Sequence, residues 1–317
     1  MTTTPAPDKP VALVIGASRG IGRQIAIDLA KNGYTVIVAA KTTSSPNTTP
    51  APASPPNPNS QSSTIHTVAH EITSQGGTAY ALRVDVRSAT QITSLVTSTL
   101  ALTNNRLDVV IYNSGAIWWS SVRNTPLKRF QLMQQVNPEG LYATIMAVLP
   151  VFEKQGNRGR VVVVSPPVYS RFWRGKVGYA MGKVAMSVLT KGLAMDFVRE
   201  GKKDMAVTSL WPATAIESAA TEMNPGSGSK EDLRKPTIFS DAVLGILNSP
   251  AHIVNGMLAL DEDFLRKYCG VEDFSKYSVV PGTTPRRIMP KEFPVLEVAE
   301  QDDEGVRMDS TKGRAKL

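Results

Sequence analysis

The sequence has few of the residues on which several classes of protein depend. Cys269 is the only cysteine in 317 residues, so no internal disulfide forms and a reducing interior compartment is expected. His66 and His70 lie four apart on a predicted helix without a third ligand, which argues against a metal site. No apolar run approaches the ~20 residues of a membrane span, and the longest, 141–152, is typical of a buried helix.

Positive charge is plentiful but is not arranged as in nucleic-acid-binding proteins. The chain has 35 Lys and Arg against 27 Asp and Glu, a formal charge of +8. The basic residues are scattered, with no stripe and no recognition motif, so nucleic acid is not expected as a partner. An anionic cofactor or substrate is a simpler use of this charge.

The chain does contain a regular alternation of strand and helix patterns, and its 42% apolar content suits a globular core. Buried strands are predicted at 11–15, 34–40, 79–86, 107–112, 160–164, 205–211 and 253–260. Helical patterns separate them. This alternation predicts a single-domain α/β fold of the Rossmann type, with a doubly wound parallel sheet of about seven strands and helices on both faces.

Three polar stretches depart from that alternation. Residues 42–63 are dominated by Ser, Thr, Pro and Asn, a composition that predicts a flexible surface insertion. Residues 1–9 are expected to form a flexible N-terminus. Residues 281–317 are expected to form an irregular tail, disordered over 301–316. The predicted domain therefore covers 10–280.

The residues 11–22, VALVIGASRGIG, predict a nucleotide-binding turn. Gly16, Gly20 and Gly22 follow a strand and open a helix with the spacing G-x-x-x-G-x-G. Glycines let the backbone turn sharply and approach phosphates, and the helix N-terminus offers unpaired N–H groups. The unit is typical of binding to a dinucleotide pyrophosphate.

Tyr179 and Lys183 form the second informative pattern. They lie four apart at the start of a predicted helix, so both project from one face. A phenol titrates near pH ~10, and a neighbouring ammonium lowers that pKa, which gives a usable general acid/base. The pair alone also fits a solvated helix face. Its place after a fifth strand, in a chain that opens with the glycine turn, favours catalysis.

These motifs together resemble the short-chain dehydrogenase/reductase family over roughly residues 10–262. The likeness rests on GASRGIG, on YNSG at 112–115, on VNPEG, which contains Asn137, and on YAMGK at 179–183. Three further segments resemble the hydroxysteroid-dehydrogenase-like branch of that family, although this sequence shows no counterpart of the branch's appended sterol-carrier domain. They are KTT at 41–43, SPP at 165–167 and WPATAI at 211–216.

The resemblance implies a role for several residues. Tyr179 would exchange the substrate proton, Lys183 would also bind the nicotinamide ribose, and Asn137 would position a proton-relay water. Asn113 would hold the central strand beside the cofactor, and Asp85 would meet the adenine edge, although Asn113 also fits a turn and Asp85 a cap. Further cofactor contacts would come from Gly16, Ser18, Arg19, Gly20, Ile21, Gly22, Lys41, Val86 and Pro212.

Pro138 supports the role of Asn137 on physical grounds. A proline inside a helix removes one N–H and presses on the carbonyl four residues earlier, here that of Gln134. This predicts a kink that frees backbone groups for water beside Asn137. The alternative is that Pro138 simply ends one helix.

Two positions depart from the family pattern: Ala213, where the family usually has glycine after Pro212, and residue 166. The family has a serine thirteen residues before the tyrosine, and this chain has Pro166 there. Ser165 is the nearest candidate, but along a strand its side chain would point to the opposite face. A backbone distorted by proline would re-aim Ser165, and Tyr169 and Ser170 are the alternative donors. The departure leaves open a cofactor-binding sensor or scaffold with little turnover.

The region expected to contact the adenosine ribose favours NADP. NAD-binding relatives of this fold place Asp or Glu ~20 residues after the glycines to bind the 2′-hydroxyl. Residues 39–41 contain no carboxylate. Arg19 and Lys41 are placed to reach a 2′-phosphate. The alternative is that both are solvated surface cations.

Two loops are expected to shape a substrate pocket. They combine aromatic residues with arginines and are 116–124, with Trp118, Trp119 and Arg123, and 168–176, with Arg171, Phe172, Trp173 and Arg174. This mixture suits an apolar substrate with an anionic group, such as an acyl thioester. It equally suits an oligomer contact or core filling.

The predicted function is thus NADP(H)-dependent interconversion of a carbonyl and an alcohol on an apolar, lipid-like substrate. A tailoring reductase of a biosynthetic pathway remains a further alternative. The family resemblance implies a homodimer or homotetramer.

The last three residues, Ala315–Leu317, resemble the S-K-L peroxisomal address, which an import receptor reads from a free C-terminus. Peroxisomal location is therefore expected, with the cytoplasm as the alternative.

Overall fold

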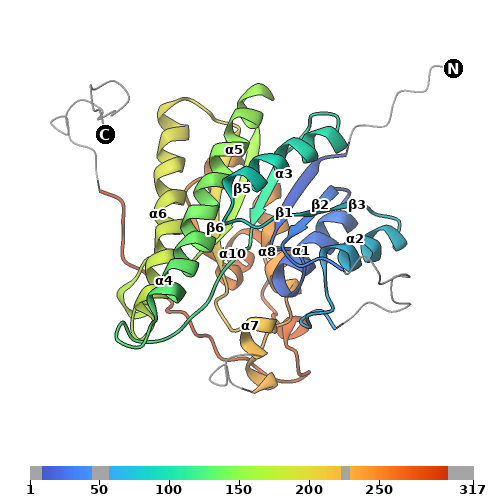
Figure 1. Cartoon of the computed structure of the whole chain (residues 1–317). Coiled ribbons are helices and arrows are strands. Elements are labelled where there is room, and N and C mark those ends of the chain that lie inside the picture. Colours follow the sequence, from blue (N-terminus) through green and yellow to red (C-terminus); the bar gives the residue numbers. More distant parts are fainter. Residues whose placement is uncertain (1–8, 45–56, 223–228, 299–317) are drawn as a thin grey trace.

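The computed structural model describes residues 9–44, 57–222 and 229–298 (Figure 1). These residues form one seven-stranded parallel sheet in the order β3-β2-β1-β4-β5-β6-β7. The strands are β1 Val11–Ile15, β2 Thr35–Ala40, β3 Thr78–Arg83, β4 Val109–Tyr112, β5 Gly159–Val164, β6 Met205–Trp211 and β7 Leu258–Leu260. The predicted doubly wound α/β fold is confirmed. The strand order reverses between β1 and β4, so a crevice is expected at their carboxyl ends.

Helices cover both faces of the sheet (Figure 1). One face packs against α1 Gly20–Lys31, α2 Ile65–Ser74, α8 Thr237–Asn248, α9 Ala251–Val254 and α10 Asp261–Cys269. The other packs against α3 Ala89–Leu102, α5 Gly140–Lys154 and α6 Val177–Arg199, and α4 Leu127–Gln134 packs beside α6. Successive residues of β1 serve opposite faces, since Leu13 lies in one apolar cluster and Val14 in the other.

The seventh strand is shorter than the sequence predicts. The apolar run 253–260 divides into the end of α9, a turn and the three-residue β7. Gly256 adopts a φ of +75°, and the side chain of Asn255 donates a hydrogen bond to the carbonyl of Ala194. These two residues turn the chain, because a strand cannot continue through a left-handed conformation. The prediction of a strand from residue 253 is therefore wrong.

Part of the predicted flexible insertion is built into the domain. Residues 45–56 lie outside the described residues. Residues 57–63, however, pack on the glycine turn: the fully buried Ser63 donates from Oγ to the carbonyl of Ser18 at 2.6 Å. The N–H of Gly20 donates to the carbonyl of Pro58 at 3.0 Å. This second half of the stretch is held by the residues that it covers, which corrects the prediction of flexibility there.

The described part of the C-terminal stretch, 281–298, is irregular, as predicted, but it also packs on the domain. The N–H groups of Ile288 and Met289 both donate to the carbonyl of Ala213. The ring of Phe293 lies 5.4 Å from that of Tyr169. The stretch thus borders the segment that follows β6. The predicted N-terminus 1–8 and the end of the tail lie outside the described residues.

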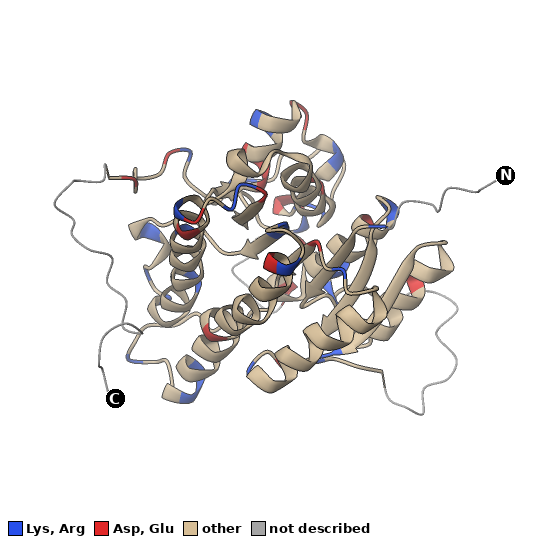
Figure 2. Cartoon of the chain, turned by 90° about the horizontal axis from the view of Figure 1, so that it is seen from above, with Lys and Arg blue, Asp and Glu red and all other residues tan. Residues whose placement is uncertain are grey.

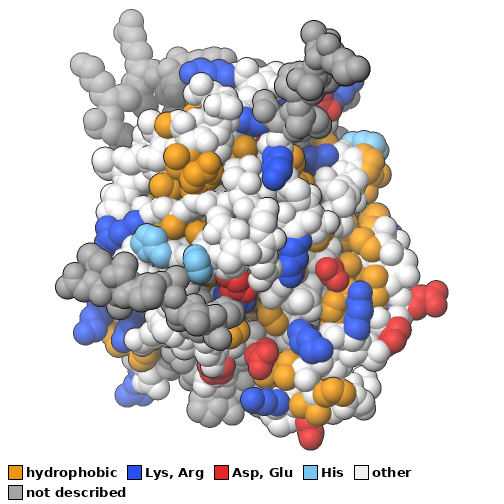
Figure 3. Space-filling view, turned by 90° about the vertical axis from the view of Figure 1, so that its right-hand side faces the viewer, with side chains coloured by type: hydrophobic (Ala, Val, Ile, Leu, Met, Phe, Trp, Pro, Cys, Tyr) orange, Lys and Arg blue, Asp and Glu red, His pale blue; other side chains and the backbone are white. Residues whose placement is uncertain are grey.

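The surface of the described residues has no concentrated basic stripe. Figure 2 shows Lys and Arg distributed over many separate elements. On the face seen in Figure 3, apolar side chains occur in small groups between charged and polar ones. None of the described helices is long and apolar enough to cross a membrane. Within the same residues, no group of three or more His, Cys, Asp or Glu is placed to hold a metal ion.

Candidate active site

The glycine turn between β1 and α1 is packed too closely for any side chain at two positions. A Cβ on Gly16, whose φ is +88°, would lie 2.7 Å from the backbone nitrogen of Ser114. A Cβ on Gly22 would lie 2.2 Å from the carbonyl oxygen of Gly16. The side chain of Asn113 donates to that same oxygen at 2.9 Å and so ties the end of β4 to the turn, as the resemblance implies.

This turn presents unpaired donors. The N–H groups of Ile21 and Gly22 have no acceptor among the described residues. They lie in the first turn of α1, where the helix dipole is positive. A pyrophosphate fits this cradle, because it would accept from both groups while the glycines allow close approach. Ser18 is buried beneath the turn.

The end of β2 gathers positive charge. The Nζ of Lys41 lies 3.2 Å from Asp85, which also pairs with Arg87. Hydrogen bonding from Arg87 holds the pKa of the Asp85 carboxyl well below its usual range. Arg19 donates to the Oγ1 of Thr42 at 3.2 Å. Lys41 and Arg87 thus pair with one carboxylate, and Arg19 bonds the residue next to Lys41. Val86, the next predicted contact, is buried in the core.

Tyr179 and Lys183 lie one turn apart near the start of α6, and both are buried. The Nζ of Lys183 donates to the carbonyl of Val164, at the end of β5, at 2.7 Å. Burial lowers the pKa of Lys183 to about 7 and raises the pKa of Tyr179 above its ordinary value. A Cβ on Gly115 would lie 3.5 Å from the Nζ of Lys183 and 3.6 Å from the Oδ1 of Asn137. The structure therefore brings the three predicted residues Tyr179, Lys183 and Asn137 to one place.

Asn137 sits where a helix changes its hydrogen bonding. Residues Gln135–Glu139 form a π-helical segment between α4 and α5, with Pro138 inside it. The hydroxyl of Tyr112 donates to the carbonyl of Val136 at 2.6 Å. The helix is thus distorted at Pro138, as predicted, and the carbonyl of Val136 accepts from a side chain instead of from the helix backbone. The amide of Asn137 bonds both the N–H and the carbonyl of Ala116, at 2.8 and 3.2 Å, so it fixes the loop after β4.

The structure does not bring Ser165 to Tyr179. The Oγ of Ser165 lies 2.9 Å from the Oγ of Ser209 on β6, and both serines are buried. The adjacent carbonyl of Pro166 accepts from Ser187 at 2.7 Å. In this position Ser165 has no contact with the tyrosine and cannot donate to a carbonyl beside it. Of the suggested substitutes, Ser170 is exposed, and Tyr169 donates to the sulfur of Met289 at 3.4 Å.

The segment after β6, which begins with Pro212, is fixed by the start of α10. The N–H of Ala213 donates to the Oδ1 of Asp261 at 2.8 Å, and the hydroxyl of Thr214 donates to Glu262 at 2.9 Å. Burial raises the pKa of Asp261 to about 7. These bonds hold the backbone that follows Pro212 at the same edge of the sheet as Tyr179.

Aromatic rings enclose Tyr179. Trp119 and Phe172 lie 6.1 and 6.2 Å from its ring centroid. Phe172 also packs edge-on against Trp211 at 5.8 Å. The sequence predicts arginines beside these rings, but Arg123, Arg171 and Arg174 are all exposed and none of them stacks on a described ring. The cation over the rings is Lys176, which the sequence analysis did not single out.

The stretch 57–63 is a second part of the site that was not predicted. The side chain of Asn59 donates to Glu222 at 3.0 Å, at the end of α7 Ala219–Glu222. A Cβ on Gly20 would meet both Asn59 and Ser218 within 4 Å. The stretch therefore joins the glycine turn to the segment after β6. No apolar periodicity marks it, so pattern alone could not have found it.

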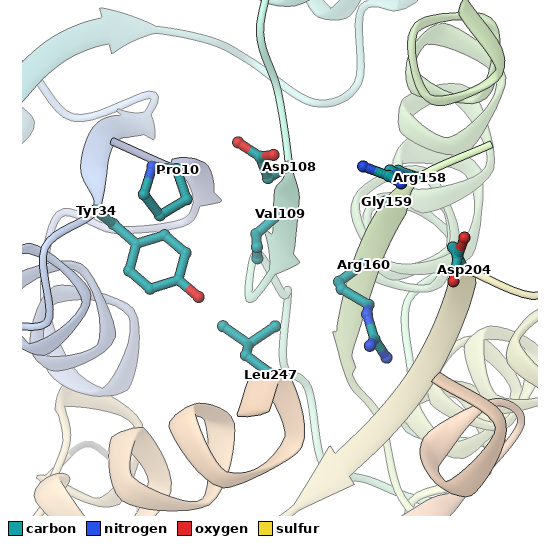
Figure 4. Close-up of a pocket in the computed structure, with 9 residues that line it drawn as sticks. All are labelled: Pro10, Tyr34, Asp108, Val109, Arg158, Gly159, Arg160, Asp204 and Leu247. Carbon is teal, nitrogen blue, oxygen red and sulfur yellow. The ribbon is translucent and has the colours of Figure 1, made fainter. Parts of the chain in front are cut away.

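The opposite edge of the sheet holds a cavity of about 330 Å³, seen in Figure 4. Its lining is Pro10, Tyr34, Asp108, Val109, Arg158, Gly159, Arg160, Asp204 and Leu247. These residues lie where β1, β4 and β5 begin, whereas the groups described above lie where the strands end. The cavity is therefore separate from Tyr179.

Comparison with known proteins agrees with this geometry. The family model described as short chain dehydrogenase matches residues 10–53 and 59–228. Hydroxysteroid dehydrogenase-like protein 2 of Mus musculus is 36% identical over 85% of this chain, and that of Xenopus tropicalis is 35% identical over the same share. The chain spans 51% and 60% of the lengths of these relatives.

Among solved structures, a putative dehydrogenase from Xanthomonas campestris is similar with a TM-score of 0.75 and 32% identity. The alignment covers 92% of this chain and 98% of that one. A short chain dehydrogenase from Mycobacterium thermoresistibile has a TM-score of 0.74 and 30% identity, covering 88% and 93%.

Proposed function

The chain belongs to the short-chain dehydrogenase family, and we propose that it interconverts a carbonyl and an alcohol by hydride transfer with NADP(H). One observation carries the proposal. Tyr179, Lys183 and Asn137 converge beside the glycine turn, at the edge of the sheet where two helix N–H groups remain available to a phosphate.

Tyr179, Lys183 and Asn137 have different roles in the reaction. A bound nicotinamide supplies the hydride. Tyr179 donates its proton to the oxygen of the carbonyl as negative charge develops there, and the positive charge of Lys183 stabilises the phenolate that remains. Asn137 holds the loop at Ala116, so the wall opposite the tyrosine stays fixed. The aromatic rings exclude bulk water, which strengthens these electrostatic interactions.

The cations at the end of β2 support NADP over NAD. Arg19, Lys41 and Arg87 lie near the end of β2, and the carboxylate beside them is that of Asp85. Asp85 is already paired with two of these cations. A phosphate there gains charge-assisted hydrogen bonds with Arg19 and Lys41.

The substrate is apolar. Phe172 packs against Tyr179 and Trp211, Trp119 packs against Tyr179, and Lys183 lies over Trp211, so aromatic rings line this part of the site. Aromatic rings of this kind bury the hydrocarbon or aromatic part of a substrate, including that of an acyl thioester. Tyr179 then contacts the single polar atom that reacts, the carbonyl oxygen.

A sensor with little turnover is the second candidate, and Ser165 is the observation that favours it. The serine bonds Ser209 and leaves the carbonyl of a substrate with one donor, Tyr179, instead of two. A missing donor of this kind costs about 10²–10³ in rate in enzymes where it has been removed. The loss of this donor does not change cofactor binding.

A screen of NADPH consumption against ketones, aldehydes and ketoacyl thioesters separates the two candidates. Turnover that disappears in Tyr179→Phe, with NADPH affinity retained, supports the oxidoreductase. NADPH binding without consumption of cofactor by any carbonyl compound supports the sensor.

Assembly and location belong to the proposal as well. Exposed apolar side chains on α5 and α6, Tyr142, Met146, Met181, Val188, Met195 and Val198, support a homodimer or homotetramer. Light scattering of the wild type and of Val188→Asp tests this.

Peroxisomal import rests on Ala315–Leu317, which lie outside the described residues. It stays a prediction, tested by imaging an N-terminally labelled chain with and without that tripeptide.

A further inference from the structure

Lys176 places a second ammonium group beside the proposed proton donor. It is the residue immediately before α6, three positions before Tyr179. Its Nζ lies 4.4 Å from the ring centroid of Phe172 and 5.3 Å from that of Trp119. The same two rings pack against Tyr179. The cation is therefore held over the rings that flank the tyrosine, a contact favoured by the negative faces of the rings.

This charge has no carboxylate partner in the part of the chain that the structure describes. The side chain is half-buried, and burial lowers the pKa of its ammonium group. The other charged groups on the aromatic cluster are also cations: Lys183 lies over Trp211 at 5.4 Å and Arg129 over Trp118 at 4.7 Å. An anion beside Lys176 would be attracted by its ammonium group, and Lys183 and Arg129 add positive charge to the same aromatic cluster.

Trp118 supplies an independent observation. Its indole Nε1 is buried and has no acceptor among the described residues. The side chain packs on the cluster formed by Met133, Phe172, Tyr179 and Ala180. A buried N–H without an acceptor is costly and uncommon in folded proteins. A ligand that brings an acceptor oxygen to this cluster removes that cost.

We propose that Lys176 and Trp118 form an anion-binding subsite for the substrate, and that the substrate is an apolar keto acid whose carboxylate binds there. The rings that contact Lys176 also contact Tyr179, so a carboxylate at Lys176 and a carbonyl at Tyr179 can belong to one small molecule. A thioester whose charges lie at the far end of a long carrier does not meet that spacing. The inference rests on the proposed function, because it takes Tyr179 as the group that the carbonyl reaches.

The test uses a stable aromatic keto acid, 3-benzoylpropionate, and its uncharged methyl ester. Binding of each to the NADP⁺ complex is measured by calorimetry and by quenching of tryptophan fluorescence, without turnover. The acid is expected to bind wild type at least about tenfold more tightly than the ester. Lys176→Met should remove that preference and leave ester binding unchanged, while Lys176→Arg should retain most of it. Arg174→Met, an exposed cation in the same loop, is the matched control.

Equal affinity for acid and ester in the wild type overturns the inference, as does an absence of acid binding. A Lys176→Met variant that weakens both probes equally also overturns it, since the side chain would then act only by packing. NADP⁺ affinity and circular dichroism verify that each variant is folded, and Lys176→Gln repeats the test with a polar side chain. Reduction of neutral ketones without acid preference would refute the subsite alone. Tight acid binding without reduction of any carbonyl would refute the proposed function alone.

Discussion

The two edges of the sheet carry similar side chains and differ in what surrounds them. At the carboxyl edge Tyr179 lies one helical turn from Lys183; at the amino edge Tyr34 and Arg160 line one cavity (Figure 4). Burial raises the pKa of both tyrosines and lowers the pKa of both cations. A tyrosine and a cation whose pKa values are shifted by burial thus occur at both edges of the sheet.

What distinguishes the carboxyl edge is the direction of the chain. In a parallel sheet the helix that follows each strand begins at the carboxyl edge, so free N–H groups and positive helix ends gather there. Ile21 and Gly22 supply them here. At the amino edge Asp108 instead accepts from the N–H of Val11 and pairs with Arg106. A shifted pKa therefore marks burial alone, whereas the orientation of the surrounding backbone determines which buried pair can take part in catalysis.

The largest expected effect comes from removing the hydroxyl at each edge. Tyr179→Phe should lower kcat for carbonyl reduction by about 10²–10⁴-fold, because the proton donor is lost. NADPH affinity should stay within about twofold of wild type, since no phosphate contact changes. Tyr34→Phe should leave both quantities unchanged. Steady-state kinetics and fluorescence titration of the two variants measure this; equal losses in both would abolish the distinction between the edges.

The second effect is a pH dependence that belongs to Lys183. Burial lowers its pKa to about 7, so the ammonium loses its proton as pH rises through that value. The phenolate formed when Tyr179 gives up its proton then loses its stabilising charge. We expect kcat/KM for reduction to fall above pH 7, approaching about tenfold per pH unit.

Lys183→Arg tests whether this pH dependence comes from Lys183, because a guanidinium stays charged across this pH range. Its profile should be flatter above pH 7, whatever its absolute rate. A wild-type profile that rises between pH 7 and 9 in the direction of reduction would contradict the assignment.

The third effect concerns the charge near the glycine turn. NADPH should bind at least about tenfold more tightly than NADH, and Lys41→Ala should reduce this ratio severalfold by removing one cation from the 2′-phosphate. Arg158→Ala at the amino edge removes an equal charge and should leave the ratio unchanged. Calorimetric titration of both variants with both cofactors distinguishes a local contact of Lys41 from the overall positive charge of the protein. A ratio near one in the wild type would refute NADP selectivity.

The smallest effect tests whether Ser165 takes part at all. Ser165→Ala should change kcat/KM by less than about threefold, because its hydroxyl is bonded to Ser209 rather than directed at the tyrosine. Thermal unfolding should shift by no more than a few degrees, because Ser209 keeps its hydrogen bond to the backbone carbonyl of Ser165. A loss as large as that of Tyr179→Phe would show that the serine turns toward the substrate during the reaction.

The core of the site could be anticipated from the sequence because its chemistry depends on local spacing. Gly16 and Gly22 are needed where backbone meets backbone, and Tyr179 and Lys183 share a face through helical periodicity alone. The distortion at Pro138 follows from the missing N–H of proline, and the structure confirms it.

Other parts depend on packing between segments that are distant in the chain. Nothing local distinguishes Lys176 from Arg171 and Arg174 in the same loop, yet of these only Lys176 lies over Phe172 and Trp119. The polar composition of 57–63 correctly predicts the absence of a helix or strand. It does not reveal that Ser63 meets Ser18, because a hydrogen bond formed across 45 residues leaves no periodic pattern.

The way in which the stretch 42–63 is anchored also bears on how this chain tolerates change in length. Its two ends are joined before the intervening residues begin: the N–H of Ile65 donates to the carbonyl of Thr42, and the hydroxyls of Ser44 and Thr64 lie 2.8 Å apart. Because the two ends are joined to each other, a longer connection between Ser44 and residue 57 leaves these contacts in place, at an entropic cost of about 0.6 kcal/mol for each doubling of its length. Peptide tags or reporter groups can therefore be inserted between these ends, a short distance from the glycine turn.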